Sequence, residues 1–99
     1  MNSVFFTMST LINKNSYAHT LYNTKCLFYE MITSHFARNH NLQCIKIRPC
    51  MITGFDEPSN SSVDEVAVIQ IDINHHQKSR TYFYLVFKLA FYDLILGLS

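Results

Sequence analysis

The chain has 99 residues, of which 48% are hydrophobic and 15% charged, with a formal net charge of +1. This length limits the protein to one small domain, and so apolar a composition excludes an intrinsically disordered chain. The near-neutral charge without a basic cluster argues against nucleic-acid binding, and no apolar run approaches the ~20 residues of a membrane-spanning helix.

The first predicted element is an N-terminal hairpin. Residues 4–12 are apolar and β-branched, residues 13–16 (Asn-Lys-Asn-Ser) supply turn chemistry, and residues 17–22 return as a second strand.

A short helix is predicted next. Thr33 is a suitable N-cap, and the helix is expected to extend to His40, with Phe36 and His40 on one face. Asn41 suits the left-handed position after the helix, with Leu42 packing back onto it.

Strands and turns fill the rest of the chain. Residues 44–48 alternate in polarity as a strand, residues 53–62 form an exposed hairpin tip, and residues 63–73 make a long strand. A second turn at residues 74–77 leads to a strand over residues 81–87.

The last predicted element is a short buried strand over residues 94–97, introduced by Asp93, which we expect to order the turn before it. Taken together, the elements predict a mainly β domain with one helix.

Three segments carry a resemblance to one family, the retropepsin-type aspartic proteases of gypsy-type retrotransposons. Residues 91–98 (Phe-Tyr-Asp-Leu-Ile-Leu-Gly-Leu) resemble the family's tail signature, and residues 34–42 resemble its helix with a His-Asn-Leu exit. Residues 52–68 are similar to the flap region of fungal members. These landmarks follow the family's order and cover about residues 17–98.

The resemblance implies a fold and an ancestral reaction. The fold is a mainly β, retropepsin-like (acid protease) closed β-barrel or sandwich half with one short helix, formed as a single domain over residues 1–99. The reaction is hydrolysis of peptide bonds in a polyprotein by two aspartates, one from each subunit of a homodimer, without a cofactor or metal.

The resemblance also assigns individual residues. It aligns the family's catalytic Asp-Thr/Ser-Gly motif with Asn23, Thr24 and Lys25 of this chain. The remaining assignments are the flap residues that contact substrate and the structural signature near the C-terminus: Thr53, Gly54, Phe55 and Asp56, and then Leu94, Ile95, Leu96 and Gly97.

Two departures from the motif bear on activity. Asn23 keeps the shape of aspartate but does not ionise, so a homodimer would lack the base that activates water. Lys25 stands where glycine lets the loop turn tightly beside its symmetry mate, and either it disturbs this turn or its side chain points outward and the turn shifts. We therefore expect a catalytically inactive domain, although the sequence leaves enzyme activity undecided.

Family members continue beyond the position that matches Ser99, with a Pro-Trp pair, a helix and further structure. We therefore expect weak dimerisation, either with a second copy or with an intact retropepsin subunit. A non-catalytic interaction module of this kind is the alternative to an inactive relic.

The cysteines and the N-terminus indicate a reduced, intracellular protein. Cys26, Cys44 and Cys50 are odd in number and lack CxxC spacing, which argues against a disulfide framework or a zinc site. The N-terminus lacks the pattern of a secretory signal, so we expect a cytoplasmic location.

Other polar residues suggest weaker alternatives. Cys26 with His19 as its base would make a nucleophilic pair, but a buried structural thiol is the expected role of Cys26. The adjacent His75 and His76, with His35 or His40, lack a metal-binding spacing, and we expect a solvated turn there. Two acidic pairs near the flap could form a glycosidase dyad or a cation site, but we expect them to be solvated: Asp56 and Glu57, and Asp64 and Glu65.

Overall fold

The computed structural model describes residues 5–23, 30–53, 60–73, 76–89 and 91–97. The described residues form seven strands and one short helix, which confirms the prediction of a mainly β protein. The elements in chain order are β1 (Phe5–Ile12), β2 (Ser16–Asn23), β3 (Met31–Thr33), α1 (Ser34–Asn39), β4 (Gln43–Thr53), β5 (Asn60–Ile73), β6 (His76–Val86) and β7 (Leu94–Gly97). Within the described part of the chain, no helix reaches the length and apolarity that crossing a membrane demands.

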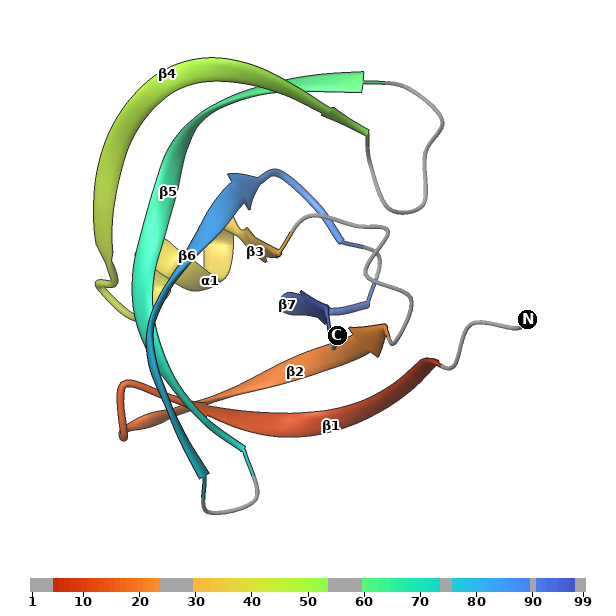
Figure 1. Ribbon diagram of the computed structural model, residues 1–99, viewed down its shortest axis with the longest axis vertical. Coiled ribbons are helices and arrows are strands. Elements are labelled where there is room, and N and C mark those ends of the chain that lie inside the picture. The colour runs from red at the N-terminus through yellow and green to blue at the C-terminus, as the bar shows by residue number, and fades with distance from the viewer. Residues whose placement is uncertain (1–4, 24–29, 54–59, 74–75, 90, 98–99) are drawn as a thin grey trace.

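The strands form one mixed sheet in the order β1-β2-β7-β3-β6-β5-β4, and a further pairing of β1 with β5 closes six of them into a barrel. β7 runs parallel to β2, and β3 runs parallel to β6, while the other pairs are antiparallel. Figure 1 shows β4 and β5 arching over β3 and β6, with the β1–β2 hairpin along the opposite side.

The N-terminal hairpin forms as predicted, with eight residue pairs between Phe5↔Asn23 and Ile12↔Ser16. Its turn has positive φ at both central residues, 52° at Asn13 and 63° at Lys14, and the Asn15 N–H donates to the Ile12 carbonyl at 3.1 Å. This is the pattern of a type I′ turn, whose twist matches that of the strands on either side.

Both predicted ends of the helix are confirmed. The Thr33 hydroxyl accepts a hydrogen bond from the Phe36 N–H at 3.2 Å, which caps the N-terminus of α1. Asn41 has φ 52°, and the Leu42 N–H donates to the Ala37 carbonyl at 2.9 Å, so the helix ends in a Schellman-type motif. His40 is exposed, although its ring lies 4.2 Å from that of Phe36.

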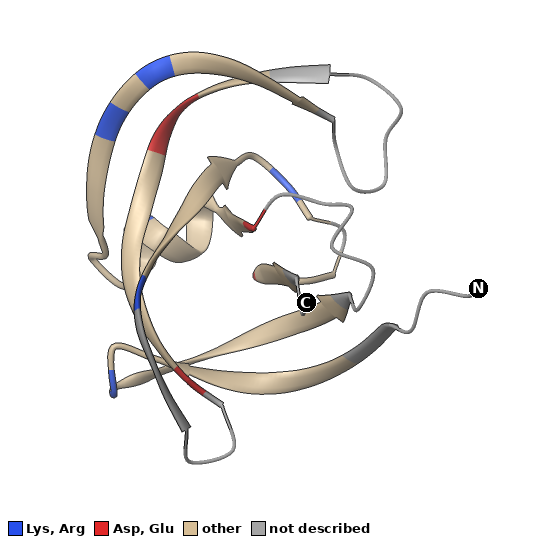
Figure 2. Cartoon of the chain, in the orientation of Figure 1, with Lys and Arg blue, Asp and Glu red and all other residues tan. Residues whose placement is uncertain are grey.

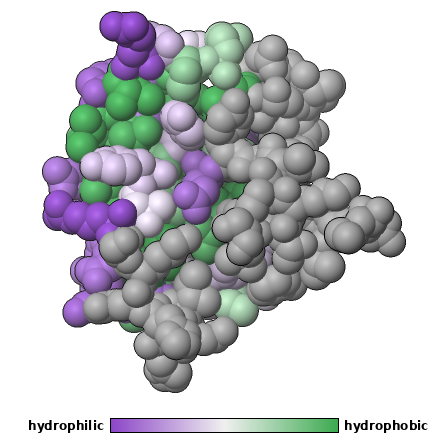
Figure 3. Space-filling view, in the orientation of Figure 1, coloured by the Kyte–Doolittle hydropathy of each residue, from purple (hydrophilic) through white to green (hydrophobic). Residues whose placement is uncertain are grey.

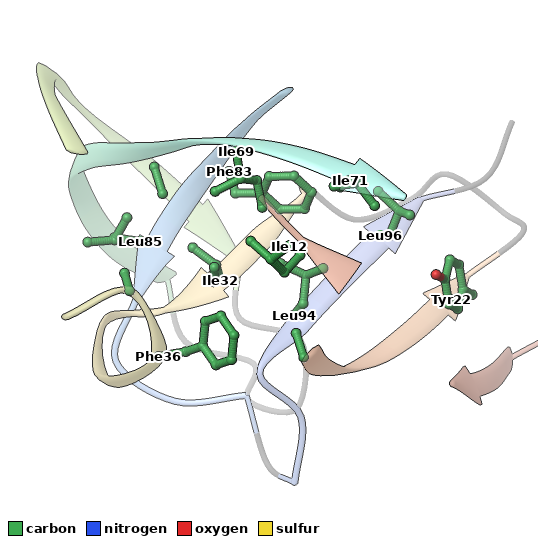
Figure 4. Packing of buried hydrophobic residues seen from close by; sticks show 13 residues of the cluster. Ile12, Tyr22, Ile32, Phe36, Ile69, Ile71, Phe83, Leu85, Leu94 and Leu96 are labelled. Carbon is green, nitrogen blue, oxygen red and sulfur yellow. The ribbon is translucent and has the colours of Figure 1, made fainter. Parts of the chain in front are cut away.

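The barrel encloses the first of two hydrophobic cores (Figure 4). Ile69 and Ile71 of β5 face Phe83 of β6 in this first core, and Phe36 covers it from α1. Leu94 and Leu96 of β7 lie in the same core and are fully buried. β7 is therefore apolar throughout because it is covered on both faces, as the second core below shows.

Four elements differ from the prediction. β5 begins at Asn60, inside the predicted hairpin tip, because its pairing with β4 continues to Thr53↔Asn60, and residues 54–59 of that tip lie outside the described residues. β3 was not predicted, because three residues are too few to show a periodicity. β4 extends to Thr53, beyond the predicted residues 44–48, because a bulge between Lys46 and Cys50 lets the strand continue past Pro49. β6 begins at His76, which falls in the predicted second turn.

β4 is the strand at one edge of the sheet, since it pairs only with β5 among the described residues. Lys46 and Arg48 are exposed along it (Figure 2), and Lys46 forms a 3.4 Å ion pair with Asp64 of β5. Hydrophobic and hydrophilic surfaces alternate on this side of the molecule (Figure 3), where Ile45 and Met51 are also exposed.

Candidate functional site

The strands β2 and β7 end together, and this fixes the backbone position of Asn23, the first residue of the predicted motif. The register pairs Leu21 with Ile95, Tyr22 with Leu96 and Asn23 with Gly97. The backbone of Asn23 therefore lies beside that of Gly97, at the carboxyl ends of two adjacent parallel strands.

Asp93 aligns these two strands at their other ends. Its carboxylate accepts a hydrogen bond from the His19 N–H at 2.9 Å, and its own N–H donates to the His19 carbonyl at 2.8 Å. Its carbonyl accepts from the Thr33 N–H at 3.0 Å, which adds β3 to the same arrangement. The prediction that Asp93 orders the turn before the last strand is confirmed, because one residue bonds both neighbours of β7.

His19 has a structural role that the sequence did not reveal. Its Nδ1 lies 3.0 Å from the Phe91 carbonyl, and because a carbonyl only accepts hydrogen bonds, Nδ1 must carry the proton. Its ring also lies 5.1 Å from that of Tyr92. His19 thus holds the segment before β7, a role that requires knowledge of a contact 72 residues along the chain.

A second core lies on the other face of β7. One row across the sheet, Leu21–Ile95–Met31, consists of neighbours in the registers of β2, β7 and β3. All three are at most 3% exposed, and they pack with Ile52 and Val63 from the β4–β5 hairpin. The β4–β5 hairpin therefore covers this row, whose Leu21 lies two residues before Asn23 on β2.

Tyr22 and Thr10 form a buried polar pair in the neighbouring first core. The two hydroxyl oxygens lie 2.6 Å apart, and both residues are 1% exposed. Burial raises the pKa of the Tyr22 phenol, and the hydrogen bond to Thr10 opposes that shift only in part. Tyr22 is therefore neutral at physiological pH, and its hydrogen bond to Thr10 anchors β2 at the residue immediately before Asn23.

Several predicted site residues lie outside the described residues: Thr24, Lys25, Gly54, Phe55 and Asp56. The backbone of Thr53 ends β4, where it pairs with Asn60 of β5. The signature residues Leu94, Ile95 and Leu96 are fully buried, and they form β7 together with Gly97.

The competing nucleophile and cation hypotheses gain no support from the described residues. Cys26 is outside them. The Cys44 thiol is exposed, but partial desolvation and the charge of Glu65 raise its pKa, so it carries little thiolate at neutral pH. Asp64 pairs with Lys46 instead of forming a carboxylate dyad.

The hypothesis of a metal site formed by histidines also gains no support from the described residues. His75 is outside the described residues. His35 Nε2 lies 3.0 Å from Asn39 Nδ2, and His40 Nδ1 lies 3.0 Å from the Ser16 hydroxyl. Among residues whose positions are described, no group of three or more His, Cys, Asp or Glu side chains is arranged to hold a metal ion.

A closed mixed sheet, one short helix after β3 and a short strand between β2 and β3 define a retropepsin-like fold. A solved structure with this fold is that of EIAV protease complexed with the inhibitor HBY-793, with a TM-score of 0.57. The alignment covers 95% of this chain and 82% of that chain at 17% sequence identity, which establishes the fold alone. No protein-family model matches the sequence, and the comparison with curated proteins also gives no match.

Proposed function

We propose that this chain is a degenerate aspartic peptidase domain of a gypsy-type retroelement, formed as one domain over residues 1–99. Its ancestral activity is peptide-bond hydrolysis by two aspartates at a homodimer interface. The observation that supports the proposal is the retropepsin-like fold, together with the pairing of Asn23, the last residue of β2, with Gly97 of β7.

The proposed loss of activity follows from the chemistry of the dyad. In aspartic proteases two carboxylates share one proton, and the ionised member takes a proton from the attacking water. An amide at position 23 of both subunits provides neither the base nor the exchangeable proton. General acid–base assistance contributes ~10²–10⁴ in rate, and the dyad also positions the water, so activity falls below detection.

Lys25 adds a second obstacle in this proposal. Glycine at that position accepts backbone conformations and a close approach to the partner subunit that a residue with a Cβ resists. Replacing only Asn23 therefore does not restore the site, and both positions have to change.

The direct test is the double reversion Asn23→Asp with Lys25→Gly. We expect pepstatin-sensitive cleavage of a peptide library by the double variant and none by the unchanged chain. The single variants Asn23→Asp and Lys25→Gly are the matched controls. A double variant that is folded and dimeric, yet neither cleaves peptides nor binds pepstatin, contradicts the assignment of the motif.

An activity of the unchanged chain would point elsewhere. Cleavage that resists pepstatin and disappears in Cys26→Ser supports the cysteine nucleophile. Cleavage that disappears in Asp56→Asn or Asp93→Asn assigns catalysis to another carboxylate and overturns the proposal.

A second candidate function is a non-catalytic partner of an intact retropepsin subunit. Phe87 and Phe91, 91% and 86% exposed in the segment before β7, favour a protein partner that would cover them. Because each subunit supplies one aspartate, a mixed dimer would have half a dyad. Co-purification of this chain with an active retropepsin as an inactive, stable heterodimer supports this function, and the failure of the two to associate excludes it.

A further inference from the structure

The barrel closes through a short seam between β1 and β5. Only two residue pairs join the two strands, Leu11↔Asp72 and Ile12↔Ile71, whereas β1 and β2 share eight. A seam of two pairs provides few of the ladder hydrogen bonds that hold the other strands together.

Asn13 extends this seam by one residue, because its backbone and its side chain both bond to Gln70. Its N–H donates to the Gln70 carbonyl at 2.9 Å, and its Oδ1 accepts from the Gln70 N–H at 2.9 Å. At Gln70 the register between β5 and β6 shifts, between Ile69 and Ile71, and the extra residue of this irregularity lies on β6. One asparagine thus satisfies both backbone groups of Gln70.

One feature of the closed seam is unfavourable. The Oδ1 atom of Asp72, which is paired with Leu11 across the seam, is buried and has no hydrogen-bond partner among the described residues. A buried polar atom without a partner loses its hydration without compensation.

We propose that the β1–β5 seam opens as a local unit, independently of the rest of the barrel, and that the Asn13 side chain is its latch. In the open state the tip of the β1–β2 hairpin separates from β5, while β2 stays paired with β7 and β7 with β3. Opening exposes Ile12 and Ile71, which are fully buried in the closed state. This inference is independent of the proposed peptidase ancestry.

Residue-resolved amide hydrogen exchange of the full chain tests the seam directly. The Asn13 and Gln70 amides report on it, and the Thr33 and Asp93 amides, bonded to Asp93 and His19 carbonyls, serve as references in the sheet. We expect the seam amides to exchange at least tenfold faster than the references, with little dependence on low concentrations of urea. Equal rates for both sets mean that the seam opens only on global unfolding, and they overturn the proposal.

A matched set of variants tests the latch. Asn13→Gly keeps the positive φ but removes the acceptor, and it should speed Gln70 exchange on the order of tenfold without changing the Thr33 and Asp93 amides. Asn13→Asp keeps an acceptor oxygen and should leave Gln70 slow, and Lys14→Gly, which relieves the turn without touching the seam, should not speed it. If Asn13→Gly leaves Gln70 unchanged, or speeds all four amides equally, the side chain is not the latch of a local opening.

Discussion

At the scale of single residues, a phenol buried in the first core makes the stability of the protein depend on pH. Tyr22 is among the largest fully buried side chains, and its hydroxyl bonds to Thr10 on the neighbouring strand. Burial raises the pKa of this phenol above its usual value of 10.0, because the ionised form would lose its hydration. The unfolded chain therefore releases this proton at a lower pH than the folded chain does.

Tyr22→Phe should consequently change both the stability and its pH dependence. Below pH ~10 the free energy of unfolding should fall by about 1 kcal/mol, because the hydrogen bond with Thr10 is lost. As pH rises above that value, the unfolded wild-type chain ionises first, so wild type loses stability that the variant keeps. Urea unfolding at pH 7 and pH 10.5 measures the difference between the two proteins. A difference that is the same at both pH values contradicts the assignment.

Lys14 offers a simple gain in stability. It occupies a left-handed conformation, φ 63°, in the second central position of the type I′ turn, where glycine is favoured. Lys14→Gly should raise the free energy of unfolding by about 1 kcal/mol, the usual cost of this conformation for a residue with a Cβ. Thermal unfolding compares it with Lys88→Gly, an exposed lysine outside the hairpin, which should bring no such gain.

At the scale of elements, β4 shows how an exposed edge strand avoids pairing with other chains. Charged Lys46 and Arg48, the bulge between Lys46 and Cys50, and Pro49 within it interrupt an edge that also carries exposed Ile45 and Met51. Charges, proline and bulges are the usual means by which edge strands are kept from aggregating. The ion pair of Lys46 with Asp64 is exposed and contributes little stability.

Removing these charges should therefore affect association more than stability. The double variant Lys46→Val, Arg48→Val should self-associate at concentrations at which the wild type does not change its state, because the edge becomes continuous and apolar. Sedimentation velocity over a concentration series measures this. The double variant Arg80→Val, Lys88→Val, at exposed positions off this edge, is the matched control. Equal association of the two variants would show that lost charge, and not the edge, is responsible.

The last strand depends on Asp93 in a way that a conservative variant separates. Asp93→Ala removes the acceptor for the His19 N–H and should lower the free energy of unfolding by about 1–3 kcal/mol. Asp93→Asn keeps an acceptor oxygen and should lose clearly less. Chemical denaturation monitored by circular dichroism compares them, and equal losses would show that the charge, and not the hydrogen bond, matters.

At the scale of the whole molecule, local signals in the sequence predicted local structure well. The Asn13–Ser16 turn, the Thr33 and Asn41 caps and the Leu94–Gly97 strand all depend on neighbouring residues, and all four are confirmed. The order of strands and the parallel pairing of β2 with β7 depend on contacts across the chain. The family resemblance implied a closed barrel or sandwich half, but neither the strand order nor the parallel pairing was predicted, because periodicity carries no information about partners.

The same distinction applies to the candidate site. The apolar residues Leu94, Ile95 and Leu96 predicted a buried strand, and the resemblance supplied the alignment of Asn23 with the catalytic position. The hydrogen bonds of His19 with Phe91 and Asp93 join residues more than 70 positions apart, so no local pattern could have revealed them. The residues that hold the strands in register were therefore harder to predict than those that form them.

The position of β7 has a consequence for synthesis of the chain. Its four residues come last among the strands, yet they lie between β2 and β3 and complete both cores. Until β7 has been synthesised, β2 and β3 lack the strand that joins them, so their apolar side chains remain exposed to solvent. The barrel is thus completed by its final segment, and a nascent chain without residues 94–97 should depend on chaperones to remain soluble.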